Sequence, residues 1–402
     1  MSMNTGVSGL NAANENLNAI SNNIANANTV GYKSMDVQFA DVYSSATGTG
    51  GVYVSSVDTN FAGGDLLYTS SATDLAIEGG GFFVMEDASG QQYYTRAGNF
   101  STDKDGFLVN NQGQKLMGFA VDGNGNVIEG QLVELSVNTA DLGASASGSV
   151  NLTANLDARA ESPEEPFNPE DPSSYNSTTT TTVFDSLGNE HQLTAYYIKS
   201  EEDGEWTVRY QANGEDVTNP DGSVFEEELL FDEDGQLSGN GVVELPTINF
   251  ENGSAPLSLN MDISGFSQYG SDFSVSTNSQ NGYGAGSFLG VSISDEGAIV
   301  ATYSNGQSQV QGYVALADFP NTSGLDTAGN TSWSETSKSG TPLIGLPGSG
   351  TLGTLTDSAL ENSNVNLSSE LVDMIVAQSA YQANTKTIST ANENTSYLLN
   401  TF

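Results

Sequence analysis

The sequence predicts an α+β protein that is mostly β, with paired, coiled-coil-like helices at its two ends and two nested β-rich domains inserted between them. Both ends of the chain repeat apolar residues three and four positions apart, which is the spacing of one helix face. The interior instead alternates short apolar runs with Asp-Gly, Asn-Gly and Gly-rich turns, as antiparallel strands do. With 402 residues, 45 of them Gly, the chain is long enough for roughly two or three turn-rich domains.

Residues 1–30 are expected to form the N-terminal helix, in which Glu15 is the only charged residue. Its apolar stripe has a heptad-like spacing and consists of Met3, Leu10, Ala13, Leu17, Ile20, Ile24 and Ala27, with Val7 beside it. Asparagine disfavours helix interiors because its amide competes for backbone groups. We expect the asparagines of this helix to form a polar, uncharged surface: Asn16, Asn18, Asn22 and Asn23. Gly31 is expected to end the helix as a left-handed C-cap.

Residues 365–402 are expected to form the C-terminal helix. From Leu367 its seam positions alternate four and three residues apart. They are Leu371, Met374, Gln378, Tyr381, Thr385, Ile388, Asn392, Thr395 and Leu399. Because four of these are polar, the seam is too weak for an isolated coiled coil but adequate where many neighbours share the contact. We therefore expect the two end helices to meet.

Self-assembly is expected to rest on the apolar members of the two stripes. They are Leu10, Leu17, Ile20, Ile24, Leu371, Met374, Tyr381, Ile388 and Leu399. Between the helices, residues 31–74 and 325–364 are expected to be extended connecting or hinge segments. Residues 75–145 and 285–324 are expected to form the first β domain. The Gly- and Ser-rich stretches 44–51 and 339–353 suggest flexible connections.

Residues 146–284 are expected to form an acidic outer β domain. This region holds 25 of the 50 acidic residues and only three basic ones. The stretch TTTTTVFDSLGNEHQLTAYYIKS predicts a strand, a turn at Asp185–Asn189 and a second strand, and residues 206–211 predict a third. The stretch ESPEEPFNPEDP has four prolines within ten residues and predicts an exposed loop.

The charge and the residue inventory exclude several classes of function. A formal net charge of −41 argues against a nucleic-acid partner and against an anionic membrane surface. The absence of cysteine excludes disulfides, thiolate metal sites and a cysteine nucleophile. No stretch approaches the roughly 18 apolar residues of a membrane span, so no membrane insertion is expected. Residues 1–32 lack Lys, Arg and a long apolar run, so no cleaved signal peptide is expected.

The short motifs that carry chemistry in other proteins are weak in this sequence. GSGTLG, from Gly348, fits a dinucleotide-binding pattern but has no βαβ unit around it, and DGNGNVIEG, from Asp122, lacks the glycine and glutamate of a calcium loop. The acidic runs at 226–228 and 232–234 are expected to be solvated, and His191, the only histidine, is expected on a strand with Leu193 and Ala195. We therefore predict no catalytic, cofactor or metal site and no enzyme. A glycan-binding module and, more remotely, an acidic glycosidase remain alternatives.

Two terminal motifs carry a resemblance to a known family. The segment LNAANENLNAISNNIANANTVGYKS resembles the N-terminal signature of the flagellar rod, hook and hook-associated axial proteins, and NVNLSSELVDMIVAQSAYQANTKTIST resembles their C-terminal signature. The segment YYTRAGNFSTDKDGFLVNNQGQKLMGF is similar to the β region of rod and hook members. The signature residues are Asn26, Gly31, Tyr32, Lys33, Gln378, Tyr381, Gln382 and Asn384. Ser379 and Asn392-Glu393-Asn394 depart from the Arg and the DEM pattern that many members carry.

The length and the inserted region resemble the hook members of this family rather than the shorter distal rod members, which stay the alternative. The resemblance implies a curved helical tube that acts as a universal joint between motor and filament, with the terminal helices innermost and the acidic domain outermost. It also implies export through the flagellar type III apparatus, and the distal rod, hook cap and hook–filament junction proteins as partners. Part of the asparagine surface around Asn22 and Asn23 is then expected to face the channel.

Overall fold

The computed structural model describes residues 2–44, 49–128 and 130–401. The chain divides into two compact units. The first comprises Met1–Thr139, Gly290–Thr302 and Ser308–Phe402, and the second comprises Ala140–Leu289 and Tyr303–Gln307. None of the helices in the described residues has both the length and the apolar character needed to cross a bilayer.

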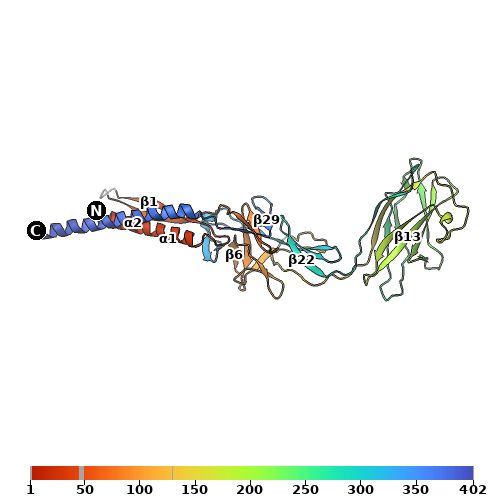
Figure 1. Ribbon diagram of the computed structural model, residues 1–402, viewed down its shortest axis with the longest axis horizontal. Helices are drawn as coiled ribbons and strands as arrows, with labels where there is room; N and C mark the ends of the chain where they lie inside the picture. Colours follow the sequence, from red (N-terminus) through yellow and green to blue (C-terminus); the bar gives the residue numbers. More distant parts are fainter. Residues whose placement is uncertain (1, 45–48, 129, 402) are drawn as a thin grey trace. The chain divides into compact units, whose positions relative to one another are not determined.

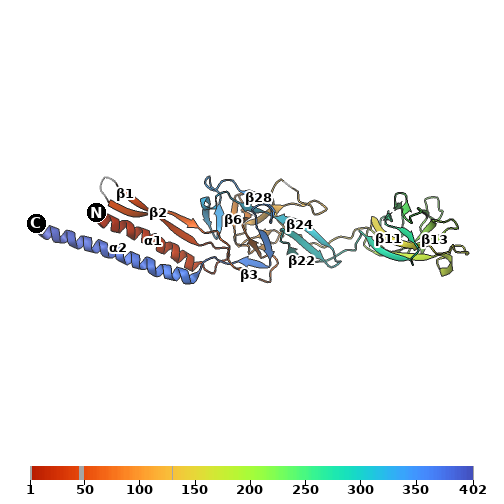
Figure 2. The same ribbon diagram turned by 90° about the horizontal axis from the view of Figure 1, so that it is seen from above.

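In the first unit the two ends of the chain lie side by side as antiparallel helices (Figure 1). They are α1, Ser2–Ala25, and α2, Leu367–Thr401. A long antiparallel hairpin of β1, Met35–Ser44, and β2, Thr49–Thr59, packs against α1. Figure 2 shows α1 between this hairpin and α2. The helix pair and the hairpin therefore form one elongated layer of the first unit.

The first helix ends earlier than the sequence predicts. It stops at Ala25, and the backbone N–H and the side-chain amide of Asn26 both donate to the carbonyl of Asn22. An asparagine amide that competes for a helical carbonyl is a known reason for a helix to end. Gly31 does have a left-handed φ of 69°, but it lies beyond the helix and is not its C-cap. Its conformation belongs to the junction described below.

Most of the remaining first unit is a 13-stranded sheet. Its strands are β5 Phe82–Glu86, β6 Gln92–Thr95, β7 Ser101–Thr102, β8 Leu108–Val109, β9 Lys115–Phe119, β10 Val133–Glu134, β22 Phe288–Ile293, β23 Ala298–Tyr303, β24 Ser308–Val314, β25 Leu316–Asp318, β26 Asp326–Gly329, β27 Ser332–Ser334 and β28 Leu343–Gly345. Two small pairs flank it: β3 Leu66–Tyr68 with β30 Ala359–Glu361, and β4 Leu75–Glu78 with β29 Thr354–Asp357. A short 3-10 helix, η2, spans Thr322–Gly324. An aromatic core that includes Phe82, Tyr94, Phe319 and Trp333 holds these strands together.

The expected connecting segments are more regular than the sequence suggests. Residues 35–44 pair with residues 49–59, and residues 326–361 supply the strands β26 to β30. Within the Gly- and Ser-rich stretch 339–353, β28 pairs with β25. The expectation of a flexible connection at 44–51 falls partly on residues 45–48, which lie outside the described residues. The sequence hides β29 and β30 because their partners, β4 and β3, lie far away along the chain.

The second unit, named here the inserted domain, packs two sheets around one core. One sheet contains β11 Ser149–Asp157, β18 Val242–Glu244, β19 Asn260–Asp262, β20 Ser267–Tyr269 and β21 Ser274–Gln280. The other contains β12 Ser177–Phe184, β13 Glu190–Lys199, β14 Glu205–Ala212, β15 Glu215–Asp216, β16 Glu226–Phe231 and β17 Leu237–Ser238, and a 3-10 helix, η1, spans Pro172–Ser174. Both sheets contribute to the core, because every second side chain of β11 and of β14 is buried.

The strand–turn–strand prediction in the inserted domain is confirmed. β12 and β13 pair around a turn at Asp185–Asn189, and β14 follows. The inserted domain begins and ends a few residues outside the expected limits of 146–284. The reason is that the two flanking stretches pair with each other, through isolated bridges between Leu142 and Gly286 and between Ser145 and Tyr283.

Candidate functional site

Two glycines on α1 allow α2 to approach closely. A Cβ atom at Gly6 would lie 2.9 Å from Cγ1 of Ile388, and one at Gly9 would lie 2.6 Å from Oδ1 of Asn384. Glycine in a helix interior costs roughly 1 kcal/mol relative to alanine. The close approach gives a physical reason for both glycines in a helix that is otherwise regular.

The structure places the predicted self-assembly residues in three different environments. Ile20 is buried within the subunit. A second group is partly buried: Leu10, Leu17, Ile24, Met374, Tyr381 and Ile388. Leu371 and Leu399 are exposed, the latter by 76%. A role for these residues in assembly stays a prediction.

One exposed apolar group on α2 was missed by the heptad pattern. Val372, Ile375 and Val376 are 60%, 64% and 62% exposed, and Leu371 lies beside them. We name these four residues the α2 apolar strip. The missed signal was the run LVDMIVA, whose apolar residues are too many for a single seam. An exposed apolar strip of this kind marks a surface for interaction.

The hairpin is attached to α1 by a few polar contacts. The Thr5 hydroxyl donates to the Gly50 carbonyl at 2.9 Å, and the Val52 N–H donates to the Ser8 hydroxyl oxygen at 3.4 Å. A Cβ atom at Gly51 would lie 2.9 Å from the same Ser8 oxygen. A two-stranded hairpin is marginal in water by itself, so the contact with α1 gives it a support.

Asn23 is a buried connector and not part of a polar surface, which corrects the expectation for this residue. Its side chain is 1% exposed. Its Nδ2 donates to the Met35 carbonyl and to Oε1 of Glu370, both at 3.0 Å. Its Oδ1 accepts from the Met35 N–H at 2.9 Å and from the Tyr32 hydroxyl at 3.2 Å. We name Asn23, Tyr32, Met35 and Glu370 the helix-root cluster, because it joins the end of α1 to the starts of β1 and α2.

The carboxyl group of this cluster is electrostatically perturbed. Burial raises the pKa of Glu370, the negative charges of Asp373 and Asp36 raise it further, and the hydrogen bond from Asn23 opposes them. Burial also raises the pKa of Tyr32, to which the charge of Glu370 contributes.

The other asparagines of the helix surface differ from Asn23, because Asn18 and Asn22 are exposed and Asn16 is partly exposed.

Three charged residues form a second buried cluster, here named the ionic cluster. The Lys33 Nζ lies 2.5 Å from Oε1 of Glu361, and Nη1 of Arg96 lies 3.3 Å from Oε2 of the same carboxylate. All three side chains are almost fully buried. The Lys33 ammonium also donates to the Ala62 carbonyl at 2.7 Å, and the Gly64 N–H donates to Oε1 of Glu361 at 2.9 Å. Burial lowers the pKa of Lys33 and of Arg96, against the opposing effect of Glu361.

The neighbours of Lys33 in the signature motif also belong to this junction. The Gly31 N–H donates to the Glu361 carbonyl at 2.8 Å. A Cβ atom at Gly31 would lie 2.4 Å from the backbone N of Ala97, so the backbone approach as well as the positive φ requires glycine. The Ser34 N–H donates to Oδ1 of Asn364 at 2.8 Å. Gly31, Tyr32 and Lys33, predicted from the motif, are therefore brought together in one buried junction.

The C-terminal signature residues are not brought together in this way. Asn384 faces Gly9 of α1, and Tyr381 is partly buried. Gln378 and Gln382 are exposed on α2, as is Ser379, whose hydroxyl donates to the Ile375 carbonyl at 2.8 Å. The exposed amides are available to a neighbouring chain.

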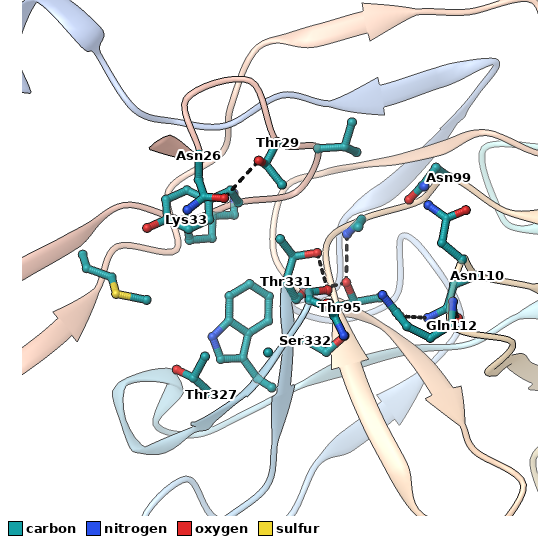
Figure 3. Close-up of a pocket in the computed structure, with 18 residues that line it drawn as sticks. Asn26, Thr29, Lys33, Thr95, Asn99, Asn110, Gln112, Thr327, Thr331 and Ser332 are labelled. Carbon is teal, nitrogen blue, oxygen red and sulfur yellow. Dashed lines mark hydrogen bonds between the residues drawn. The ribbon is translucent and has the colours of Figure 1, made fainter. Parts of the chain in front are cut away.

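A cavity of about 570 Å³, lined by both polar and apolar side chains, lies between the loop after α1 and the sheet (Figure 3). Its labelled lining residues are Asn26, Thr29, Lys33, Thr95, Asn99, Asn110, Gln112, Thr327, Thr331 and Ser332. Apart from Lys33, whose ammonium bonds Glu361 and Ala62, the described lining residues are uncharged. The loop Asn26–Val30 along this cavity bonds within its own turn, through the Thr29 N–H and hydroxyl to Asn26.

The weak chemical motifs have ordinary structural roles. Gly348 donates to the Gly353 carbonyl in a tight loop between β28 and β29. Asp122 accepts from the backbone N–H groups of Asn124 and Asn126, which closes a turn. The acidic run from Glu226 lies on β16, and the run from Asp232 forms a turn. Within the described residues no group of three or more His, Cys, Asp and Glu side chains is placed to hold a metal ion.

His191 lies on β13 as predicted, in a buried polar group. Its Nε2 lies 3.0 Å from Oδ2 of Asp185, and its ring stacks on Phe250 with centroids 3.5 Å apart. Burial disfavours the charged form of Asp185, but hydrogen bonds from His191, Asn189 and Asn252 outweigh it and hold the pKa of Asp185 well below its ordinary value. An acceptor with this many donors holds the β12–β13 turn in place.

Comparison with known families matches four models along the chain. They are described as "Flagella basal body rod protein" (residues 3–33), "Flagellar hook protein FlgE/F/G D1 domain" (76–152), "Flagellar basal body protein FlaE D2 domain" (155–283) and "Flagellar basal body rod FlgEFG protein C-terminal" (356–401). A curated relative, the "Flagellar hook protein FlgE" of Salmonella typhimurium, is 38% identical over 404 residues, covering 100% of both chains. The chain belongs to the flagellar hook protein family.

Other hook proteins support this family assignment, because they also match along nearly the whole chain. The hook protein of Escherichia coli K12 is 36% identical over 405 residues, again covering 100% of both chains. That of Borreliella burgdorferi is 32% identical over 441 residues, covering 98% of this chain and 97% of the relative. The crystal structure of Helicobacter pylori flagellar hook protein FlgE2 matches with a TM-score of 0.55 at 15% identity, covering 75% of this chain and 99% of the other. At this identity the match supports the fold alone.

Proposed function

We propose that the chain is the structural subunit of a bacterial flagellar hook and assembles with copies of itself into a curved helical tube. The observation that carries the proposal is similarity to hook proteins along the whole chain, including both helices and the inserted domain. The α2 apolar strip supports it, because burial of a valine or isoleucine is worth about 1.5–3 kcal/mol when a second copy covers it.

The tube acts as a universal joint that bends while it transmits motor torque to the filament. This requires inner contacts that persist and outer contacts that exchange as the joint rotates. The apolar strip on α2 suits the first kind of contact. The acidic surface of the inserted domain suits the second, because charged, wet contacts are weak and screened by salt.

The remaining parts of the proposal concern location and partners. The protein lies in the hook outside the cell body, after export through the flagellar type III apparatus without a cleaved signal peptide. Its neighbours there are the distal rod protein, the hook cap protein and the hook–filament junction protein. A structural subunit of this kind needs no cofactor and no catalytic group.

The alternative of a distal rod protein is not favoured. The relatives that match this chain over its full length carry the description of hook proteins, and the inserted domain matches along with the rest. A rod subunit would form a straight, rigid tube, so the curvature of the polymer separates the two functions.

Electron microscopy of the purified, assembled protein tests the proposal. We expect tubes with a central channel that become curved, and variants that lack residues 1–30 or 368–402 stay monomeric. Normal polymerisation without either terminal segment would contradict the proposal. Straight tubes under every condition would favour the rod.

A further inference from the structure

The helix-root cluster and the ionic cluster meet at two consecutive residues. Tyr32 donates its hydroxyl to Asn23 in the helix-root cluster, and Lys33 bonds Glu361 in the ionic cluster. Both side chains are buried. One short stretch of backbone therefore serves two clusters.

Each cluster gathers a different part of the first unit. The helix-root cluster holds the end of α1, the start of β1 and, through Glu370, the first turn of α2. The ionic cluster links the small β3–β30 pair to the sheet: Glu361 ends β30, and Arg96 follows the sheet strand β6 and donates to the Gly79 carbonyl at 2.9 Å. The helix pair and the sheet are thus joined through Tyr32 and Lys33.

The adjacent covalent connection has no comparable bond to the sheet. The described hydrogen bonds of the loop Asn26–Val30 go to the end of α1, within the loop and to the Tyr32 N–H, and none of them reaches the sheet. A twisting load on the helix pair therefore reaches the sheet through the two clusters more directly than through this loop.

We propose that Tyr32 and Lys33 form a bracket that carries torque between the helix pair and the sheet. This inference rests on the proposed function, since a torque-bearing joint presumes an assembled hook. The bracket needs the charge of Glu361, because that carboxylate is shared by two buried cations and accepts the Gly64 N–H as well. The two residues act by positioning the helices, since both side chains are buried within the subunit.

The test measures the twist of single hooks under known torque, with a bead tethered to the hook of a locked motor. Hooks of E361Q should twist further than wild-type hooks under the same torque, because two buried cations lose the charge that holds them to β30. Y32F removes one hydroxyl and should increase the twist by less. E134Q, which removes the exposed ion pair between Glu134 and Lys115 on the same sheet, should leave it unchanged.

The outcomes separate this inference from the proposed function. Wild-type protein that fails to form hook tubes would contradict the function itself. Normal wild-type tubes together with unchanged torsional compliance in E361Q would overturn the bracket. Where E361Q fails to fold, Y32F decides: compliance equal to that of E134Q hooks would also overturn it.

Discussion

In the inserted domain Trp206, Tyr197 and Tyr210 are almost completely buried between two sheets, whereas on α2 Ile375 and Val376 are more than half exposed. The inserted domain has a continuous core to which both of its sheets contribute. One face of helix α2 packs against the two glycines of α1, and a second, apolar face of α2 is left uncovered within the subunit.

This difference teaches where each region finds its stability. Burial of apolar area is the main favourable term in folding, and the inserted domain supplies it from its own residues. Isolated helices are marginal without packing, and the helix pair obtains only part of its packing within the subunit. We infer that the inserted domain folds alone and that the helix pair is ordered fully when neighbours cover it.

The largest expected effect tests the claim that helix α2 depends on neighbouring subunits for its packing. I375S and V376S combined should weaken assembly by roughly 3–6 kcal/mol per subunit, because both side chains lose the burial that a neighbour provides. Sedimentation of the polymer would measure this as a higher critical concentration. In the same variant the free energy of unfolding of the inserted domain should stay within about 0.5 kcal/mol of the wild-type value. V242S, a matched change at an exposed strand position, serves as control, and equal effects of both changes on assembly would count against the account.

The next largest effect tests the claim that the inserted domain is stabilised by its own core. W206A should destabilise the inserted domain by about 3–5 kcal/mol, since it removes a large, fully buried aromatic side chain. Thermal unfolding followed by far-ultraviolet circular dichroism, which reports on the backbone, would measure the loss of stability. W206F should cost less, because it keeps most of the ring volume and removes an indole N–H that has no hydrogen-bond partner among the described residues. A W206A domain as stable as wild type would refute the self-sufficient core.

A smaller effect sharpens the account of how the helices pair. G9V should cost about 1–3 kcal/mol in the assembled state, since its side chain would overlap Asn384. This corresponds to a critical concentration higher by about 5-fold to 150-fold. N11V, on an exposed position of the same helix, should have a smaller effect on it. If the two variants assemble alike, the close α1–α2 contact is not needed.

The smallest expected effect concerns pH. The raised pKa of Glu370 means that the folded helix root binds a proton more tightly than the unfolded chain. The stability that protonation of Glu370 contributes is therefore present at low pH and is lost as the pH rises through the raised pKa. E370Q should flatten this dependence, because glutamine stays neutral and can still accept from Asn23. Thermal melting of assembled tubes between about pH 4 and 7 would measure it, and identical profiles for variant and wild type would remove Glu370 as the cause.

Sequence reasoning captured the parts of the fold that depend on local pattern. The strands on either side of Asp185–Asn189 alternate apolar and polar residues around a turn, and both helices have their apolar period in the sequence. The hairpin of β1 and β2 was missed because its support, α1, lies outside its own sequence. A packing partner from another part of the chain is set by the topology of the fold, which a short window of sequence does not contain.

The candidate site was predictable as a motif but not as an arrangement. Gly31, Tyr32 and Lys33 were identified from the signature, yet their partners Arg96 and Glu361 lie 63 or more positions away and have no distinguishing sequence pattern. Asn23 shows the same limit. Its type suggests a solvated helix face, and only the proximity of Met35, Tyr32 and Glu370 makes it a buried connector.

Amide hydrogen exchange on the full chain, compared between monomer and assembled tube, tests the central claim most directly. The amides of β14, at 205–212, should be equally protected in both states, because their core belongs to the subunit. The amides of α2, at 367–401, should exchange rapidly in the monomer and become protected in the tube. Equal protection of α2 in the monomer and the tube would contradict the claim that neighbours order the helix pair.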